Sequence, residues 1–350
     1  MVAAFGYNRL ATPDARIGSK PPVSFIVVYC LGLATALMIG LRYEVGGDWI
    51  PYLGIYDQIQ LMTFSQAVLS YDPAYSAIVF VAGRLDSGIW LANLVCGLIM
   101  TFSIIRFCSR QPNPALTFLV AVPYLIIVVG MGYTRQAVAI GIILAGLADV
   151  DKQSTIKLVA YIFLAALFHK TALLVLPIIL APVLRRSVLQ SVFGFIVFVA
   201  LFLLLLRSQT DDLINNYIDS DYASSGAVVR VAMNFVPAVV AIVLRKRMKF
   251  SSYQDDMWTA FAAVSLITLP LVLTVSFTTA IDRLALFLIP LQIAILPRVP
   301  YVFSGSRSLN AQLTLAVCIY SASVQMVWLL FATNSEFWLP YRAFFINAGQ

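Results

Sequence analysis

Charged residues are scarce in this sequence. Aspartate, glutamate, lysine and arginine make up 11% of the 350 residues, whereas soluble globular domains carry about 25%. Hydrophobic residues make up 61%, and the mean hydropathy is +0.90. This composition excludes an ordinary soluble domain and indicates a protein that spans a membrane several times.

Histidine and cysteine are also rare. The chain has one histidine, His169, and four cysteines, which stand in or beside apolar stretches at unrelated spacings. Such spacings form neither a metal-binding motif nor a disulfide framework. We therefore expect no metal site and no cofactor. The cysteines are Cys30, Cys96, Cys108 and Cys318.

Apolar runs recur along the whole chain without the alternation of a β-barrel, so the sequence predicts an all-α transmembrane bundle in one domain, 1–350. Residues 75–83 are apolar but too short to cross about 30 Å of hydrocarbon, and we expect a re-entrant or interfacial half-helix there. About eleven spans are expected: 22–41, 88–107, 115–131, 136–150, 156–168, 170–184, 188–206, 227–244, 257–279, 283–298 and 310–332.

The positive charges favour one orientation. With the N-terminal tail (1–21) in the cytoplasm, fifteen of the 23 lysines and arginines fall on the cytoplasmic side and eight on the outer side. The net charge of +7 thus fits topology signals better than a nucleic-acid partner, for which no motif is present. On this topology 42–87 and 207–226 are extracytoplasmic loops, and 333–350 is an extracytoplasmic tail.

The stretch RYEVGGDW (42–49) ends the first apolar run with three charges and two glycines. Arg42 can donate two parallel hydrogen bonds to a phosphate or carboxylate, and Glu44 and Asp48 are candidate bases. The alternative is a polar interfacial loop with an Arg–Asp pair.

Three further polar groups lie on the predicted outer side. Arg135, in GYTRQA, stands at a helix start, where the dipole favours an anion, or else it snorkels to the interface. His169, in FHKTA, interrupts a long apolar run, which makes it a functional candidate. Asp282 and Arg283 are adjacent and cannot share one helix face, so Arg283 is aimed elsewhere, at a ligand, or sits in a short loop.

Single cations and carboxylates on one side of a lipid-embedded bundle suit an amphiphile with an anionic head, such as a polyprenyl pyrophosphate. Arginines would hold the pyrophosphate, the bundle would hold the tail, and outer tyrosines and tryptophans would stack on sugars.

Six segments in chain order resemble motifs of the EpsG family of exopolysaccharide-biosynthesis proteins, which are Wzy-like polysaccharide (exopolysaccharide or O-antigen) polymerases. They are RYEVGGDWIPYLGIYD (42–57), YDPAY (71–75), YTRQAVAIGI (133–142), LFHKTALLVLP (167–177), DRLALFLIP (282–290) and LPYRAFF (339–345).

The resemblance implies a glycosyltransferase of the bacterial inner membrane, similar to metal-independent C-type glycosyltransferases. It would transfer a growing glycan from undecaprenyl pyrophosphate to a hydroxyl of the next lipid-linked repeat unit at the outer leaflet. A chain-length regulator would be a further partner.

On this hypothesis, Arg42, Arg135 and Arg283 bind the pyrophosphate leaving group. Asp48, then Glu44, or else His169, accepts the proton of the acceptor hydroxyl. We expect Arg42, Arg135, His169 and Arg283 to meet around one wet chamber that opens away from the cytosol. The motifs add four candidates for pyrophosphate or sugar binding: Gln136, Tyr341, Asp72 and Tyr75.

Three alternatives belong to other classes. A flippase or transporter needs polar residues throughout the bilayer depth, whereas here they crowd toward one side. A membrane sugar O-acyltransferase would use a site reached from the cytoplasm, whereas His169 maps outside. A structural subunit would not explain His169.

Overall fold

The computed structural model describes residues 23–151, 154–184, 227–274, 278–303 and 309–344, together with positions 189, 192, 196 and 200. Across these residues the regular structure is helical, and the β contact present is an isolated antiparallel bridge between Arg42 and Ala343. The predicted all-α class is therefore confirmed for the described residues. The tail 1–21, the loop 207–226 and nearly all of the predicted span 188–206 lie outside them.

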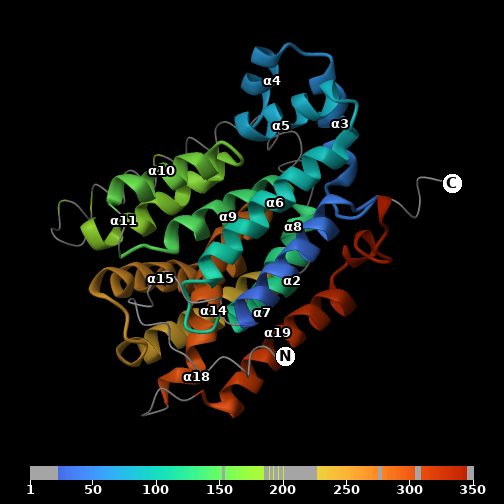
Figure 1. Ribbon diagram of the computed structural model, residues 1–350. Coiled ribbons are helices and arrows are strands. Elements are labelled where there is room, and N and C mark those ends of the chain that lie inside the picture. Colours follow the sequence, from blue (N-terminus) through green and yellow to red (C-terminus); the bar gives the residue numbers. More distant parts are fainter. Residues whose placement is uncertain are drawn as a thin grey trace.

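The helices follow one another in an elongated bundle (Figure 1). Their bounds are α2 Val23–Gly40, α3 Trp49–Gln60, α4 Phe64–Ser70, α5 Pro73–Arg84, α6 Gly88–Cys108, α7 Pro114–Ala121, the π-helix η1 Val122–Val129, α8 Gly130–Gly132, α9 Thr134–Leu147, α10 Thr155–Ala166, η2 Lys170–Val175, α11 Leu176–Leu184, α14 Ala227–Leu244, η4 Arg245–Arg247, α15 Ser252–Thr274, α16 Thr278–Ala285, η5 Leu286–Leu288, α17 Ile289–Ile295, η6 Leu296–Arg298, α18 Val299–Val302, α19 Ala311–Phe331 and η7 Ser335–Phe337.

Six helical stretches are long and apolar enough to cross a membrane, judged by length and composition. Four more are apolar but shorter, and each overlaps one of the predicted spans; they belong to α2, α9, α10 and η2–α11. The predicted number of eleven spans is therefore not confirmed. The six are Gly88–Cys108, Pro114–Gly132, Ala227–Arg247, Ser252–Thr274, Ile281–Val302 and Ala311–Phe331.

Helix α9 shows why hydropathy overestimates the spans. It has 14 residues, which is about 21 Å at a rise of ~1.5 Å per residue, short of the ~30 Å of hydrocarbon. All of its side chains except that of Arg135 are buried. Its apolar run therefore reflects the interior of the bundle rather than contact with lipid.

The predicted loop 42–87 folds into three short helices, α3, α4 and α5, which lie together at one end of the bundle (Figure 1). Helix α4 begins with a capping box in which Thr63 and Gln66 satisfy each other's backbone N–H groups. Helix α5 has 12 residues, about 18 Å, and confirms that 75–83 is a helix too short to span.

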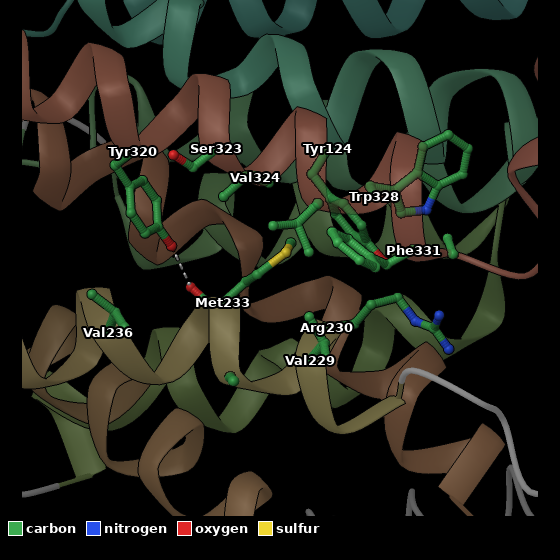
Figure 2. Close-up of a pocket in the computed structure, with 13 residues that line it drawn as sticks. Tyr124, Val229, Arg230, Met233, Val236, Tyr320, Ser323, Val324, Trp328 and Phe331 are labelled. Carbon is green, nitrogen blue, oxygen red and sulfur yellow. Dashed lines mark hydrogen bonds between the residues drawn. The ribbon is translucent and has the colours of Figure 1, made fainter.

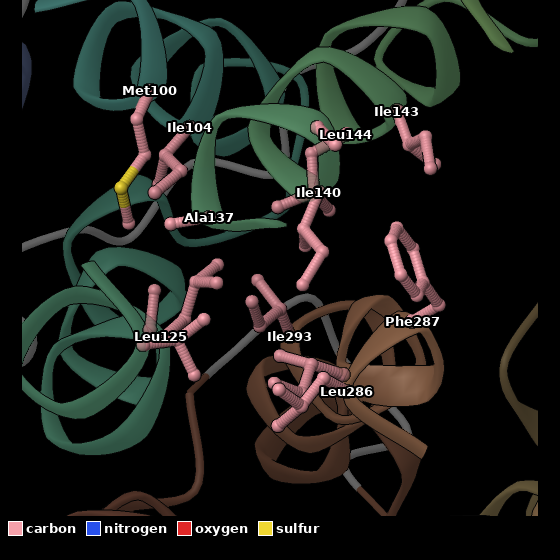
Figure 3. Packing of buried hydrophobic residues seen from close by; sticks show 14 of the residues in the cluster. Met100, Ile104, Leu125, Ala137, Ile140, Ile143, Leu144, Leu286, Phe287 and Ile293 are labelled. Carbon is pink, nitrogen blue, oxygen red and sulfur yellow. The ribbon is translucent and has the colours of Figure 1, made fainter. Parts of the chain in front are cut away.

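The core lies where α6, α9, η1 and the η5–α17 segment converge (Figure 3). Helices α6 and α9 approach each other closely, which requires small residues between them. A Cβ on Gly141 of α9 would lie 3.1 Å from the backbone of Met100 of α6. Lipid tails are as apolar as leucine, so tight packing, more than hydrophobic burial, holds such a core together. This packing fixes the start of α9, where Arg135 stands, against α6.

Polar residues gather at two ends of the bundle. At one end Asp149 pairs with Arg106 (3.2 Å) and Arg110 (2.9 Å), and Arg245 pairs with Asp255. The other end holds the candidate site residues of the sequence analysis. Helix α6, with 21 residues and therefore about 31 Å long, separates the two. The described charged residues named here thus lie at opposite ends of the bundle, and which end faces the cytoplasm stays a prediction.

Candidate functional site

Arg42 follows α2, and its side chain is 1% exposed. The structure places it inside the protein rather than at a wet chamber, because protein acceptors take its donors. Its cation also lies 5.7 Å from the centroid of Trp49. The acceptors are the carbonyl oxygens of Ile39 and Val45 (3.1 Å for the latter), Asn93 Oδ1 (3.2 Å) and Thr134 Oγ1 (2.8 Å).

Asp72 links two other candidates. It is buried just before α5, and its Oδ2 accepts a hydrogen bond from Arg135 Nη1 at 2.9 Å. The same oxygen lies 3.7 Å from His169 Nδ1, and Oδ1 accepts the backbone N–H of Lys170 at 3.4 Å. Burial acts to raise the pKa of Asp72, but His169 and Arg135 hold that pKa below its ordinary value. The carboxylate therefore stays ionised between the side chains of Arg135 and His169.

Two tyrosines support Arg135. Its guanidinium lies 5.6 Å from the ring centroid of Tyr52 and 5.8 Å from that of Tyr75, within the range of cation–π attraction. The hydroxyl of Tyr52 also accepts the backbone N–H of Arg135 at 3.3 Å. Within the described residues, the buried Arg135 Nε, Tyr75 hydroxyl and His169 Nδ1 have no hydrogen-bond partner. Such orphaned groups in one place call for a ligand or water.

Asp48 stands at the N-cap of α3 and is half-buried. Burial raises its pKa, and the charges of Arg283, Arg135 and His169 act against that rise. The side chains of Arg283, Arg135 and His169 therefore lie near this carboxyl. His169 is 19% exposed and stacks parallel to Phe287 at 6.1 Å.

Arg283 lies on α16, and its side chain is exposed. Its carbonyl oxygen accepts a hydrogen bond from the buried Gln136 Nε2 at 2.6 Å, so α16 is fixed beside the start of α9. We call Asp48, Asp72, Arg135, His169 and Arg283 the charged cluster. It brings together three of the four residues that were expected to meet, and Arg42 lies behind it in the protein interior.

The model of the EpsG family matches residues 25–343 of this chain, which is nearly its whole length. The chain belongs to the EpsG family. The EpsG family is a Wzy-like polymerase family, which indicates a polysaccharide polymerase of the glycosyltransferase type. No curated protein and no solved structure matches the chain.

Two candidates of this EpsG protein make their contacts elsewhere. Glu44 is exposed and pairs with Arg342 at 2.7 Å. Tyr341 donates its hydroxyl hydrogen to the carbonyl oxygen of Met38 at 2.8 Å. Both contacts hold the C-terminal segment against the end of α2. The structure therefore does not bring either residue into contact with the charged cluster.

Sequence reasoning missed Arg230 of the EpsG chain. Its Nε donates to both oxygens of Asp282, at 2.8 and 3.0 Å, and its Nη2 lies 2.8 Å from Oδ2. Asp282 is thus paired with α14 and not with its neighbour Arg283, as the helix geometry predicted. The signal was present, since Arg230 is a lone arginine in an apolar stretch.

Sequence reasoning also missed Tyr52 as a residue of the site. It stands four positions after Asp48 and therefore one helical turn further along α3. This spacing was the available signal that both side chains face the same neighbour, Arg135.

The charged cluster combines two guanidinium groups, one imidazole and two carboxyls at one end of an apolar bundle. Guanidinium groups match phosphate oxygens, and a carboxyl with a raised pKa accepts a proton readily. The EpsG protein can therefore hold an anionic group beside a base. Among the described residues, no three carboxylate, histidine or cysteine side chains gather as metal ligands.

Proposed function

We propose that the protein polymerises lipid-linked repeat units in the bacterial inner membrane. A growing glycan would pass from undecaprenyl pyrophosphate to a hydroxyl of the next unit at the outer leaflet. Membership of the EpsG family supports a polysaccharide polymerase. The observation that carries the finer proposal is the gathering of Asp72, Arg135 and His169 near Asp48, with Arg135 Nε and His169 Nδ1 lacking hydrogen-bond partners among the described residues.

Arg135 and Arg283 bind the pyrophosphate in this mechanism. The bond between the anomeric carbon and the pyrophosphate oxygen breaks, and its electron pair stays on that oxygen. Negative charge therefore grows on the leaving group, where fixed guanidinium donors stabilise it without reorganisation. Support comes from the unpartnered Arg135 Nε and the exposed Arg283 side chain. These two cations supply the charge stabilisation, so we propose that no metal is needed.

Asp48 is the base of choice. The acceptor hydroxyl forms the new bond to the anomeric carbon and gives its proton to this carboxylate. Burial raises the pKa of Asp48 and strengthens it as a base. His169 is the second candidate. Glu44 ranks last, because its carboxylate pairs with Arg342 at the surface.

The remaining candidates position these groups. Asp72 orients Arg135 and His169, and Tyr75 holds the guanidinium of Arg135 by its ring. Gln136 fixes the backbone at Arg283. Arg42 and Tyr341, for which the sequence predicts substrate binding, are better explained as anchors of the surrounding segments.

The test is polymer synthesis by purified protein in proteoliposomes with lipid-linked repeat units. A ladder of products supports a polymerase, and translocation alone indicates a flippase. Arg135→Ala and Arg283→Ala should each slow polymer synthesis about 10²–10³-fold, so that no ladder forms in the wild-type assay time, while the protein remains in the membrane. Arg84→Ala is the matched control, because Arg84 contacts Phe80 (4.8 Å) and not the charged cluster. A normal ladder from either test variant excludes that arginine from leaving-group stabilisation.

A further inference from the structure

A groove of about 300 Å³ lies between α14 and α19, with the π-helix η1 behind it (Figure 2). This volume is at the lower end of ligand sites in proteins. The hydroxyl of Tyr320 donates to the carbonyl oxygen of Met233 at 3.3 Å and ties the two helices together toward one end. Most of the lining is apolar, including Val229, Met233, Val236, Val324, Val327 and Phe331.

The groove opens sideways from the bundle. Val229, Val236, Val327 and Phe331 line it and are exposed. Both flanking helices are among the six long enough to cross a membrane. In a bilayer the mouth therefore faces hydrocarbon, and an apolar chain can enter without crossing water.

The other end of the groove is polar and leads toward the charged cluster. Figure 2 shows Arg230 there, below Trp328. A smaller cavity of about 20 Å³ shares Tyr124, Arg230 and Trp328 with the groove and adds Tyr133. Tyr133 directly precedes Thr134 and Arg135, and Arg230 pairs with Asp282, the neighbour of Arg283, at 2.8 Å. The groove thus leads from its apolar mouth toward the chain neighbours of Arg135 and Arg283.

We infer that this groove binds the isoprenoid tail of the lipid-linked donor, an inference that rests on the proposed polymerase function. The stretch of α19 from Tyr320 to Phe331 is about 16 Å long at ~1.5 Å per residue, which accommodates the head-proximal part of a long tail. A tail seated there places its pyrophosphate at the polar end, beside Arg283 and Arg135. A lipid without a pyrophosphate head does not gain this second contact at the polar end of the groove.

The direct test is photolabelling in nanodiscs of phosphatidylethanolamine and phosphatidylglycerol. The probe is a polyprenyl pyrophosphate with a diazirine in its isoprenoid chain, and peptide mass spectrometry locates the adducts. We expect adducts on α14 and α19 along the groove, and their loss when unlabelled polyprenyl pyrophosphate competes. A phospholipid with a diazirine in its acyl chain is the second arm, and the same competitor should displace its groove adducts.

A matched pair of variants sharpens the test. Val236 lines the groove, whereas Val239 lies on the same helix, is similarly exposed and does not line it. Val236→Trp fills the groove and should reduce polyprenyl labelling about tenfold, equivalent to ~1.4 kcal/mol of binding. Val239→Trp should leave it unchanged. Both substitutions are at exposed sites, where folding tolerates them.

Three results would overturn the inference: polyprenyl adducts elsewhere, phospholipid adducts that resist competition, or crosslinks between two protein copies at the groove. Labelling requires no turnover, so it is separable from the polymerase proposal. A polymer ladder without groove labelling refutes the tail site alone. Groove labelling without any ladder refutes the polymerase proposal alone.

Discussion

The Nη2 group of Arg42 lies 2.8 Å from Thr134 Oγ1, and this hydrogen bond joins the end of α2 to the start of α9. Asp48 lies six positions after Arg42, and Arg135 directly follows Thr134. Arg42 therefore holds together two segments that each contribute one residue to the charged cluster. We therefore expect Arg42 to act on the site through its neighbours rather than through the substrate.

Thr134→Val should destabilise the protein. The substitution keeps the shape of the side chain but removes the acceptor for a buried, charged donor, which costs about 1–3 kcal/mol of unfolding free energy. Thermal or denaturant unfolding in detergent measures this loss. The control is Thr274→Val, because Thr274 is exposed and bonds only to its own helix, so its effect should stay within about 0.5 kcal/mol. Equal effects of both variants would contradict the anchoring role.

Asp72→Asn should lower stability in a pH-dependent way. The folded-state pKa of Asp72 lies below its ordinary value. Its contribution is therefore complete above the unfolded pKa of about 3.9 and is lost as the pH falls through the lowered folded-state pKa. The difference in melting temperature between wild type and Asp72→Asn should thus be largest near neutral pH and shrink in acid. The exposed Asp57→Asn is the control. A difference that is independent of pH would show that the carboxylate charge is irrelevant.

Hydropathy was sufficient to predict the helices but not their surroundings. Each of the predicted spans except 188–206 contains a described helix, because a backbone in lipid must satisfy its own hydrogen bonds. The same apolar run, however, encodes a buried helix such as α9 or a lipid-facing one such as α19. Which of the two forms depends on packing partners far away in the chain.

The site was predictable where charge interrupts apolar sequence, as at Arg135, His169 and Arg283. Arg42 gave the same signal, yet its donors find acceptors inside the protein. One of them is Asn93, which is 51 positions away and lies within an apolar helix. No local sequence pattern distinguishes an arginine that can bind a ligand from one whose hydrogen-bond donors already bond to acceptors in the protein.

Removal of metal ions should leave polymer synthesis intact. In the proposed mechanism the guanidinium groups of Arg135 and Arg283 stabilise the pyrophosphate charge, so no cation has to be supplied. The measurement is the product ladder after treatment with EDTA and dialysis into metal-free buffer. Arg135→Lys, treated in the same way, shows whether the positive charge of an ammonium group can replace the planar guanidinium group in polymer synthesis. Loss of the ladder in EDTA, with recovery on adding Mg²⁺ or Mn²⁺, would refute the metal-independent part of the proposal.

The pH dependence of polymer synthesis should report Asp48. As the base, this carboxyl must be ionised, so kcat/KM should fall as the pH drops through its pKa. Burial raises that pKa, so the acid limb should lie above the range of an ordinary aspartate.

The positive charge of Arg283 opposes the rise, so the residual activity of Arg283→Gln should show an acid limb at higher pH. Arg283→Lys keeps the charge and should leave the limb near its wild-type position. Glu44→Gln should not move it, since Glu44 pairs with Arg342 at the surface. An acid limb that is insensitive to Arg283→Gln but moves with Glu44→Gln would transfer the base from Asp48 to Glu44.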